Sequence, residues 1–188
     1  FKRLDLGGGL GIPYNNDKTP SPQEYGIVIR EILGDMKCNL IVEPGRLIVG
    51  NAGILVTKVI YYKKGDARNF VILDAAMNDL MRPSLYDAEH EIINVIETNQ
   101  NVEKDAVDIV GPVCETGDTF ARQVRLSKCE TGDLFAIRSA GAYGATMSST
   151  YNSRALIPEV MVNKSRYTTI RERIEPETYL NYEKIPDW

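Results

Sequence analysis

Apolar residues fall into short runs, and the character of these runs changes near residue 50. Residues 1–6 look like a strand that enters the glycine-rich loop of residues 7–11. Residues 23–36 carry isoleucines and a leucine that fit one face of a helix loosely. Residues 38–42 form a short apolar run, typical of a buried parallel strand, which ends at a proline-glycine pair. Strand, loop, helix and strand in this order predict a βαβ unit.

The residue pattern changes near residue 55, where the apolar runs become rich in β-branched or aromatic residues and turn-forming residues separate several of them. This pattern predicts an antiparallel β domain. The predicted strands are residues 55–62, 69–73, 106–110 and 134–137. From residue 164 onward the chain is charged and contains tyrosines, which is typical of a surface segment. The expected fold class is therefore α/β plus β, in three parts: residues 1–50, 51–163 and 164–188.

Composition narrows the class of protein. Of the 188 residues, 43% are hydrophobic and 26% are charged, which is ordinary for a globular chain with one core or two small ones. The formal net charge is −4 and no basic cluster occurs, so a nucleic-acid partner is not expected. No apolar run reaches membrane-spanning length and no signal peptide opens the chain, so no membrane partner is expected either.

Cysteine and histidine usage bears on compartment and metal binding. Three scattered cysteines without C-x-x-C spacing predict a reducing, cytoplasmic environment. The single histidine, His90, argues against a His-rich zinc site, and no metal site is predicted. The first residues read as a strand already under way, and a natural start rarely falls there. We therefore expect the chain to be a fragment of a longer protein.

Two loops at predicted strand ends carry candidate chemistry. Gly7, Gly8 and Gly9 follow a strand, where backbone N–H groups can surround a phosphate, although an ordinary tight turn would use the same residues. The dinucleotide fingerprint fails because Ile12 stands at the position of its third glycine. In the Glu-Pro-Gly-Arg segment at residues 43–46, the carboxylate can pair with a protonated ring nitrogen and the arginine can bind an anion. A turn with a structural ion pair is the alternative.

Three further segments could place polar groups near a ligand, and each also has a simpler interpretation. Arg82 and Tyr86 offer a cation and a phenol, but most such pairs lie on the surface. Cys114 follows a strand end, where a thiol can donate a proton. A lone cysteine is, however, more often buried filler. Tyr143 lies in a Gly-Ala-Tyr-Gly turn, which suits contact with a ligand and also suits plain packing.

In their order along the chain, these segments resemble the diaminopimelate decarboxylases, a branch of the alanine-racemase-like decarboxylases that use pyridoxal 5'-phosphate. The resemblance covers residues 1 to about 163. The segments that carry it are D-L-G-G-G-L-G-I-P-Y (5–14), E-P-G-R (43–46), R-P-S-L-Y-D-A-E-H (82–90), G-P-V-C-E-T-G-D (111–118), A-G-A-Y-G (140–144) and M-S-S-T-Y-N (147–152). The implied fold is the last βα units of a (β/α)8 barrel, at residues 1–50, followed by a β domain.

The resemblance also implies a role for each matched residue. Those implied to bind the cofactor are Gly7, Gly8, Gly9, Glu43, Pro44, Gly45, Arg46 and Tyr143. Glu43 would keep the pyridine nitrogen protonated, which makes the ring an electron sink. Those implied to bind the substrate are Arg46, Arg82, Tyr86, Glu115 and Tyr143.

Cys114 is implied to be the acid that protonates the carbon from which carbon dioxide leaves. Its pentapeptide, Cys-Glu-Thr-Gly-Asp, occurs a second time at residues 129–133, an echo that we interpret as coincidence because two copies are too few for a repeat architecture. The Gly-Pro-Val prefix before Cys114 is absent before Cys129, and this distinguishes the two copies.

The implied activity is decarboxylation of meso-2,6-diaminopimelate to L-lysine, the last step of lysine biosynthesis, by a homodimer with active sites shared across the interface. The family's cofactor-binding lysine, and the histidine that stacks on the ring, would lie upstream of Phe1. His90 is not matched to that role. We expect this polypeptide alone neither to hold the cofactor covalently nor to decarboxylate. The alternatives are a related ornithine, arginine or carboxylated-polyamine decarboxylase, and a non-catalytic homologue that regulates an active enzyme.

Overall fold

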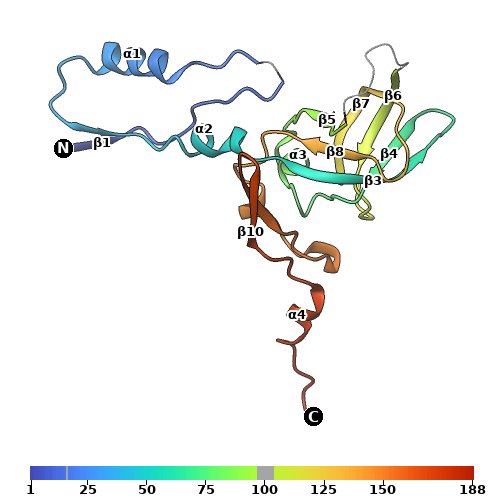
Figure 1. Cartoon of the computed structure of the whole chain (residues 1–188). Coiled ribbons are helices and arrows are strands. Elements are labelled where there is room, and N and C mark those ends of the chain that lie inside the picture. Colours follow the sequence, from blue (N-terminus) through green and yellow to red (C-terminus); the bar gives the residue numbers. More distant parts are fainter. Residues whose placement is uncertain (16, 97–103) are drawn as a thin grey trace.

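The computed structural model describes residues 1–15, 17–96 and 104–188 of the chain. A small βα region at the N-terminus leads into a curled six-stranded sheet, and a two-stranded hairpin extends from the other side of the junction between them (Figure 1). The junction consists of two short helical turns, α2 (Gly45–Val49) and η1 (Gly50–Ala52). The candidate site residues are distributed around this junction and along one end of the sheet.

The N-terminal region is the βαβ unit that the sequence predicts. Strands β1 (Arg3–Asp5) and β2 (Asn39–Ile41) pair in parallel, and helix α1 (Pro22–Leu33) connects them. The helix begins at a capping box in which the Ser21 and Glu24 side chains each accept a hydrogen bond from the other's backbone amide. It ends before Gly34, so the predicted helix is confirmed with an earlier end.

The large sheet follows the junction and contains all the strands that the sequence predicts beyond residue 55. Its strand order is β5-β8-β3-β4-β6-β7. The strands are β3 (Leu55–Lys63), β4 (Asn69–Leu73), β5 (Ile92–Asn94), β6 (Lys104–Val110), β7 (Thr119–Ser127) and β8 (Leu134–Ile137). Strands β5 and β7 are additions to the predicted set. One helix, α3 (Arg82–Tyr86), lies between β4 and β5.

The expectation of a wholly antiparallel domain was wrong, because the sheet is mixed. Strands β4 and β6 pair in parallel, with Val71 opposite Ile109, while the other pairs in the sheet are antiparallel. The chain between β4 and β6 is long enough to cross back to the end of the sheet where β4 begins, which is what a parallel neighbour requires.

A single core fills the concave side of the sheet. Along β3, Leu55, Thr57 and Val59 point inward, and the residues between them point outward. The core is formed by Leu55, Val59, Val71, Leu73, Ala75, Leu80, Val107, Ile109, Phe120, Leu126, Cys129, Phe135 and Ile137. Each large apolar side chain of this set contributes roughly 1.5–3 kcal/mol through its burial. The sheet is therefore a rigid platform for the loops at its edges.

The C-terminal hairpin consists of β9 (Glu159–Asn163) and β10 (Arg166–Arg171), and a short helix, α4 (Pro176–Leu180), follows it. The boundary predicted after residue 163 falls in the turn of this hairpin, so the two strands that pair lie on either side of it. The remaining short turns are η2 (Ala145–Met147) and η3 (Tyr151–Ser153). Most side chains of the hairpin are exposed.

Candidate active site

The glycine loop and the Glu-Pro-Gly-Arg segment lie against each other. Because β1 and β2 are parallel, their carboxyl ends meet at one edge, and the Glu43 amide donates a hydrogen bond of 2.8 Å to the Gly7 carbonyl oxygen. A side chain at residue 8 would approach the Glu43 carbonyl oxygen to 2.7 Å, so only glycine fits there. The two segments that the resemblance implies bind the cofactor are thus in direct contact.

The glycine loop presents free backbone donors. Within the described residues, the amides of Gly8 and Gly9 have no hydrogen-bond partner, and both residues are exposed. Gly9 adopts a φ of 88°, which favours glycine and lets successive amides turn toward one side. Glu43 is exposed at the end of β2, directly beside these donors. This arrangement suits a ligand that carries a phosphate on one end and a basic ring nitrogen on the other.

The turn that carries Tyr143 packs against the same junction. The Gly141 amide donates to the Gly50 carbonyl at 3.0 Å, and the Ala140 amide donates to the Gly53 carbonyl at 2.9 Å. Tyr143 itself has a φ of 62° and a half-exposed side chain. The structure therefore brings the Tyr143 turn to the end of the short helix that begins at Gly45 and contains Arg46.

Arg82 lies in the interior at the start of α3. Its side chain is only 7% exposed, and its Nη1 atom donates a 2.5 Å hydrogen bond to the Tyr14 hydroxyl. The guanidinium carbon lies 5.1 Å from the centre of the Tyr14 ring. Tyr86, at the other end of this helix, is exposed. The chain segment that follows the glycine loop thus reaches the sheet domain through Tyr14.

No acidic side chain among the described residues forms an ion pair with Arg82. A buried cation without a counter-charge is costly, and proteins usually pair such a group with a carboxylate or another anion. Arg154, by contrast, pairs with the buried carboxylate of Asp79 at 3.5 Å. A buried guanidinium without an acidic partner makes Arg82 a candidate for binding an anion.

His90 lies behind Arg82, and the sequence did not indicate this role for it. Its Nδ1 atom lies 2.8 Å from the Arg138 carbonyl oxygen, and its Nε2 atom lies 3.4 Å from Arg82 Nη1. Burial lowers the pKa of His90, and the neighbouring positive charge of Arg82 lowers it further, while the contact with Arg138 acts in the opposite direction. His90 is the last residue of the segment 82–90 that carries the family resemblance, and its place in that segment could have indicated that it lies near Arg82.

The loop that carries Cys114 and Glu115 is held by the buried carboxylate of Asp118. This carboxylate accepts hydrogen bonds of 2.7 Å from the amides of Val113 and Met77. Burial raises the pKa of Asp118, although these two hydrogen bonds and the positive charge of Arg154 oppose the shift. Cys114 and Glu115 are left exposed at the tip of the loop.

The same loop packs on α3. A side chain added at Gly117 would approach the Ser84 hydroxyl oxygen to 2.6 Å, so the Cys114 loop and the helix that contains Arg82 are in contact. Glu115 also accepts a long hydrogen bond, 3.5 Å, from the Tyr151 hydroxyl. The loop that exposes Cys114 and Glu115 therefore packs against the helix that contains the buried Arg82.

The predicted site residues thus form two groups. The first contains the glycine loop, residues 43–46 and Tyr143, and the second contains Arg82, Tyr86, Cys114 and Glu115. Across the described ranges 1–15, 17–96 and 104–188, no hydrogen bond or ion pair links a member of one group to a member of the other. Tyr14, which follows the glycine loop in sequence and binds Arg82, is the connection between them.

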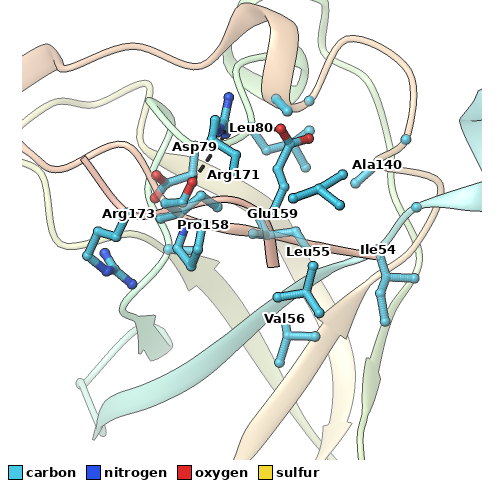
Figure 2. A pocket seen from close by; sticks show the side chains of 18 of the residues that line it. Ile54, Leu55, Val56, Asp79, Leu80, Ala140, Pro158, Glu159, Arg171 and Arg173 are labelled. Atoms are coloured by element: carbon cyan, nitrogen blue, oxygen red, sulfur yellow. Dashed lines mark hydrogen bonds and ion pairs between the residues drawn. The ribbon is translucent and has the colours of Figure 1, made fainter. Parts of the chain in front are cut away.

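A cavity of about 1260 Å³ lies between β3 and the C-terminal hairpin. Its lining includes Gly141 and Gly144, which flank Tyr143, but none of the predicted site residues. Figure 2 shows apolar side chains of β3 on one side and the charged residues Asp79, Glu159, Arg171 and Arg173 on the other. Arg171 pairs with Glu159 at 3.4 Å, so much of this charge is already matched within the chain.

In the part of the chain that the structure describes, the helices are too short or too polar to cross a bilayer. The same residues contain no group of three or more His, Cys, Asp or Glu side chains arranged to hold a metal ion.

Comparison with known proteins then assigns the chain to a family. A family described as "Pyridoxal-dependent decarboxylase, C-terminal sheet domain" matches residues 14–141. This range contains the whole six-stranded sheet and the loops of both residue groups except the glycine loop and Tyr143. The chain belongs to the pyridoxal-dependent decarboxylases.

Individual decarboxylases extend the similarity over the rest of the chain. The diaminopimelate decarboxylase of Zymomonas mobilis is 51% identical over 190 residues, covering 100% of this chain and 44% of the relative. A structure of diaminopimelate decarboxylase from Helicobacter pylori, in complex with L-lysine, covers 96% of this chain and 44% of its own, with 40% identity and a TM-score of 0.88. The enzyme from M. jannaschii covers 99% and 44%, with 38% identity and a TM-score of 0.91. The chain thus spans less than half the length of the decarboxylases that it matches.

Proposed function

We propose that this chain is the C-terminal portion of a decarboxylase that converts meso-2,6-diaminopimelate to L-lysine and carbon dioxide with pyridoxal 5'-phosphate. One observation supports the substrate assignment above the others: Arg82 is buried without an acidic ion-pair partner among the described residues, and the helix that contains it contacts, through Ser84, the loop that exposes the Glu115 carboxylate. A cation and an anion on two segments that contact each other would complement an α-amino-carboxylate group. Diaminopimelate has such a group at each end, whereas ornithine, arginine and carboxylated polyamines lack the second one.

The first residue group fits the cofactor. The free amides of Gly8 and Gly9, together with Gly7, Pro44, Gly45, Arg46 and Tyr143, would surround its phosphate. Glu43 would accept a hydrogen bond from the protonated pyridine nitrogen and keep that proton in place. When bound, the cofactor supplies the electron sink for the pair of electrons that carbon dioxide leaves behind.

The second residue group fits the substrate. Arg82 would bind the distal carboxylate, Glu115 would accept hydrogen bonds from the distal ammonium group, and Tyr86 would contact the substrate from the exposed end of α3. Arg46 and Tyr143, at the junction, would bind the substrate near the cofactor. A substrate held at both ends would be oriented so that only one carboxylate is positioned to leave.

Cys114 would donate the proton that completes the reaction. As the carbon–carbon bond breaks and carbon dioxide departs, the Cys114 thiol would give its proton to the substrate carbon, and solvent would later restore the thiol. Its exposure at the loop tip makes this transfer possible, since a proton donor has to reach the reacting carbon.

The remaining parts of the proposal concern assembly. Residues 1–50 would be the last βα units of a (β/α)8 barrel, consistent with the parallel β1–β2 pair and the exposed apolar residues Ile27 and Ile32 of α1. The two residue groups, which make no direct bonds in one chain, would form active sites across the interface of a homodimer. The three unpaired cysteines suit a reducing cytoplasm.

The test is turnover by the full-length enzyme. We expect release of carbon dioxide from meso-diaminopimelate and none above background from ornithine or arginine. Turnover of ornithine instead would support the alternative decarboxylases, and no turnover of any substrate by the cofactor-loaded enzyme would support a non-catalytic homologue.

A second measurement tests the role of Arg82 directly. Arg82→Met should raise the KM for diaminopimelate by about 100-fold or more, since a hydrogen-bonded charge pair is lost from a buried position. Arg122→Met, on the exposed face of β7, is the matched control and should leave KM unchanged. An unaltered KM in Arg82→Met would contradict the proposed substrate site.

A further inference from the structure

Two contacts connect the backbone of Arg138, just after β8, to the buried guanidinium of Arg82. The Arg138 carbonyl oxygen lies 2.8 Å from His90 Nδ1, and His90 Nε2 lies 3.4 Å from Arg82 Nη1. The His90 ring is 5% exposed, so water has little access to either nitrogen. Both ring nitrogens are therefore engaged by protein groups.

The chemistry of the two neighbours fixes the form of the imidazole. A carbonyl oxygen only accepts, so Nδ1 must carry the hydrogen. A guanidinium nitrogen only donates, so Nε2 must be the bare acceptor. A protonated ring would point an N–H and a positive charge at Arg82, and burial together with that charge lowers the pKa of His90. The neutral form with hydrogen on Nδ1 is the one that satisfies every contact.

Tyr14 also binds Arg82 Nη1, the nitrogen that contacts His90. Its hydroxyl oxygen accepts from Arg82 Nη1 at 2.5 Å, and its ring meets the His90 ring edge-on at 5.1 Å between centres. Nη1 carries two hydrogens, and these two acceptors account for both. Among the described residues, Nε and Nη2 of Arg82 have no hydrogen-bond partner. These two nitrogens share the edge of the guanidinium that binds a carboxylate bidentately.

We propose that His90 is a positioning residue that, with Tyr14, fixes Arg82 by its Nη1 atom and so presents the Nε–Nη2 edge to the substrate's distal carboxylate. This inference rests on the proposed function, because it requires Arg82 to bind substrate. A neutral acceptor can orient Arg82 without cancelling its positive charge. An aspartate or glutamate at position 90 would orient Arg82 equally well, but its negative charge would weaken the attraction between Arg82 and the substrate's distal carboxylate.

Two amide substitutions in the full-length enzyme separate the two contacts of His90. Glutamine can place an amide oxygen where Nε2 lies, whereas asparagine can place an amide nitrogen where Nδ1 lies. His90→Asn should therefore keep the contact with Arg138, lose the contact with Arg82, and raise the KM for diaminopimelate about tenfold with kcat within about twofold. His90→Gln should stay within about threefold of the wild-type KM.

Tyr14→Phe provides an independent measurement, since it removes one hydroxyl and keeps the ring. It should raise KM in the same direction, and Tyr61→Phe, an exposed tyrosine on β3, is the control that should not. Equal KM values for His90→Asn, Tyr14→Phe and the wild type would overturn the inference. So would a fall in melting temperature in both His90 variants with no difference in KM between them, because that pattern belongs to a purely structural histidine.

The Arg82→Met variant separates the positioning role of His90 from the binding of substrate by Arg82. If Arg82→Met raises KM and His90→Asn does not, the positioning role is wrong and the substrate site stands. If Arg82→Met leaves KM unchanged, both are wrong.

Discussion

The pentapeptide Cys-Glu-Thr-Gly-Asp occurs at residues 114–118, between β6 and β7, and again at residues 129–133, between β7 and β8. In the first copy the cysteine is exposed and the aspartate is buried. In the second copy the cysteine is buried in the core, at 3% exposure. The cysteine thus occupies opposite environments in the two copies, whereas the glutamate and the threonine are exposed in both.

The aspartates show where the difference comes from. Asp118 accepts from the amide of Met77, 41 residues away, and so ties its loop to the segment before α3. Asp133 accepts from the amide of Glu130, three residues away, and only closes its own turn. That turn is fastened to the sheet by backbone bonds to Val59, at 2.8 Å and 2.9 Å. The partners outside the pentapeptide, and not the pentapeptide itself, decide which copy exposes its cysteine and which copy buries it in a turn of the sheet.

The largest expected effect separates the two cysteines by function. Cys114→Ala in the full-length enzyme should lower kcat for diaminopimelate by roughly 10²–10⁴-fold, since the proposed general acid is lost. Cys129→Ala should keep kcat within about twofold and instead lower stability by about 1 kcal/mol, because it removes buried volume. Steady-state kinetics and chemical denaturation of both variants measure this. A large loss of kcat in Cys129→Ala alone would reverse the assignment.

The aspartates should differ in stability. Asp118→Ala leaves two amides without their acceptor, one of them buried, and should lower the free energy of unfolding by roughly 2–4 kcal/mol. Asp133→Ala removes one exposed hydrogen bond and should cost about 1 kcal/mol or less. Urea denaturation of the two variants is the measurement. Equal losses would mean that the long-range bonds of Asp118 add nothing.

For the glycines of the two copies, Gly117 and Gly132, the larger loss of stability is expected in the second copy. Gly132 has a φ of 99° and open space around it, so Gly132→Ala should cost about 1–2 kcal/mol through backbone strain alone. Gly117 has no such φ, and the one close contact of a methyl group there would be with the Ser84 hydroxyl, which can rotate away. Gly117→Ala should therefore cost less than about 1 kcal/mol, and Ser84→Ala should remove that cost while leaving the cost at Gly132 unchanged.

Local pattern was sufficient to predict the βαβ unit and the four apolar strands of the sheet. The resemblance implied that the glycine loop and residues 43–46 serve one cofactor, and the structure brings them into contact because the parallel strands β1 and β2 end at the same edge. Strand β7 was missed because its charged residues Arg122 and Arg125 interrupt the apolar pattern. The strand also has a bulge at Gln123, whose amide bonds to the buried Asp108 carboxylate at 2.8 Å.

The contacts around Arg82 could not be predicted. Tyr14 lies 68 residues from Arg82 in sequence, and Arg138 lies 48 residues from His90. No periodicity or spacing links residues so far apart. The resemblance to a family supplied Arg82 and Cys114 as candidates, and the structure added their supports: Tyr14, His90 and Asp118.

The most direct test of the contrast between the two copies is site-resolved alkylation of the native full-length enzyme, followed by mass spectrometry alongside activity. Burial and the nearby negative charge of Asp133 raise the pKa of Cys129 to about 11, above its unfolded value of 9.0, so the native thiol stays protonated and shielded up to pH 9. We predict that iodoacetamide at pH 8 labels Cys114 in parallel with loss of activity, that diaminopimelate slows both, and that Cys129 reacts only on unfolding. Full activity after complete labelling of Cys114, or labelling of native Cys129 at the same rate, would contradict the account.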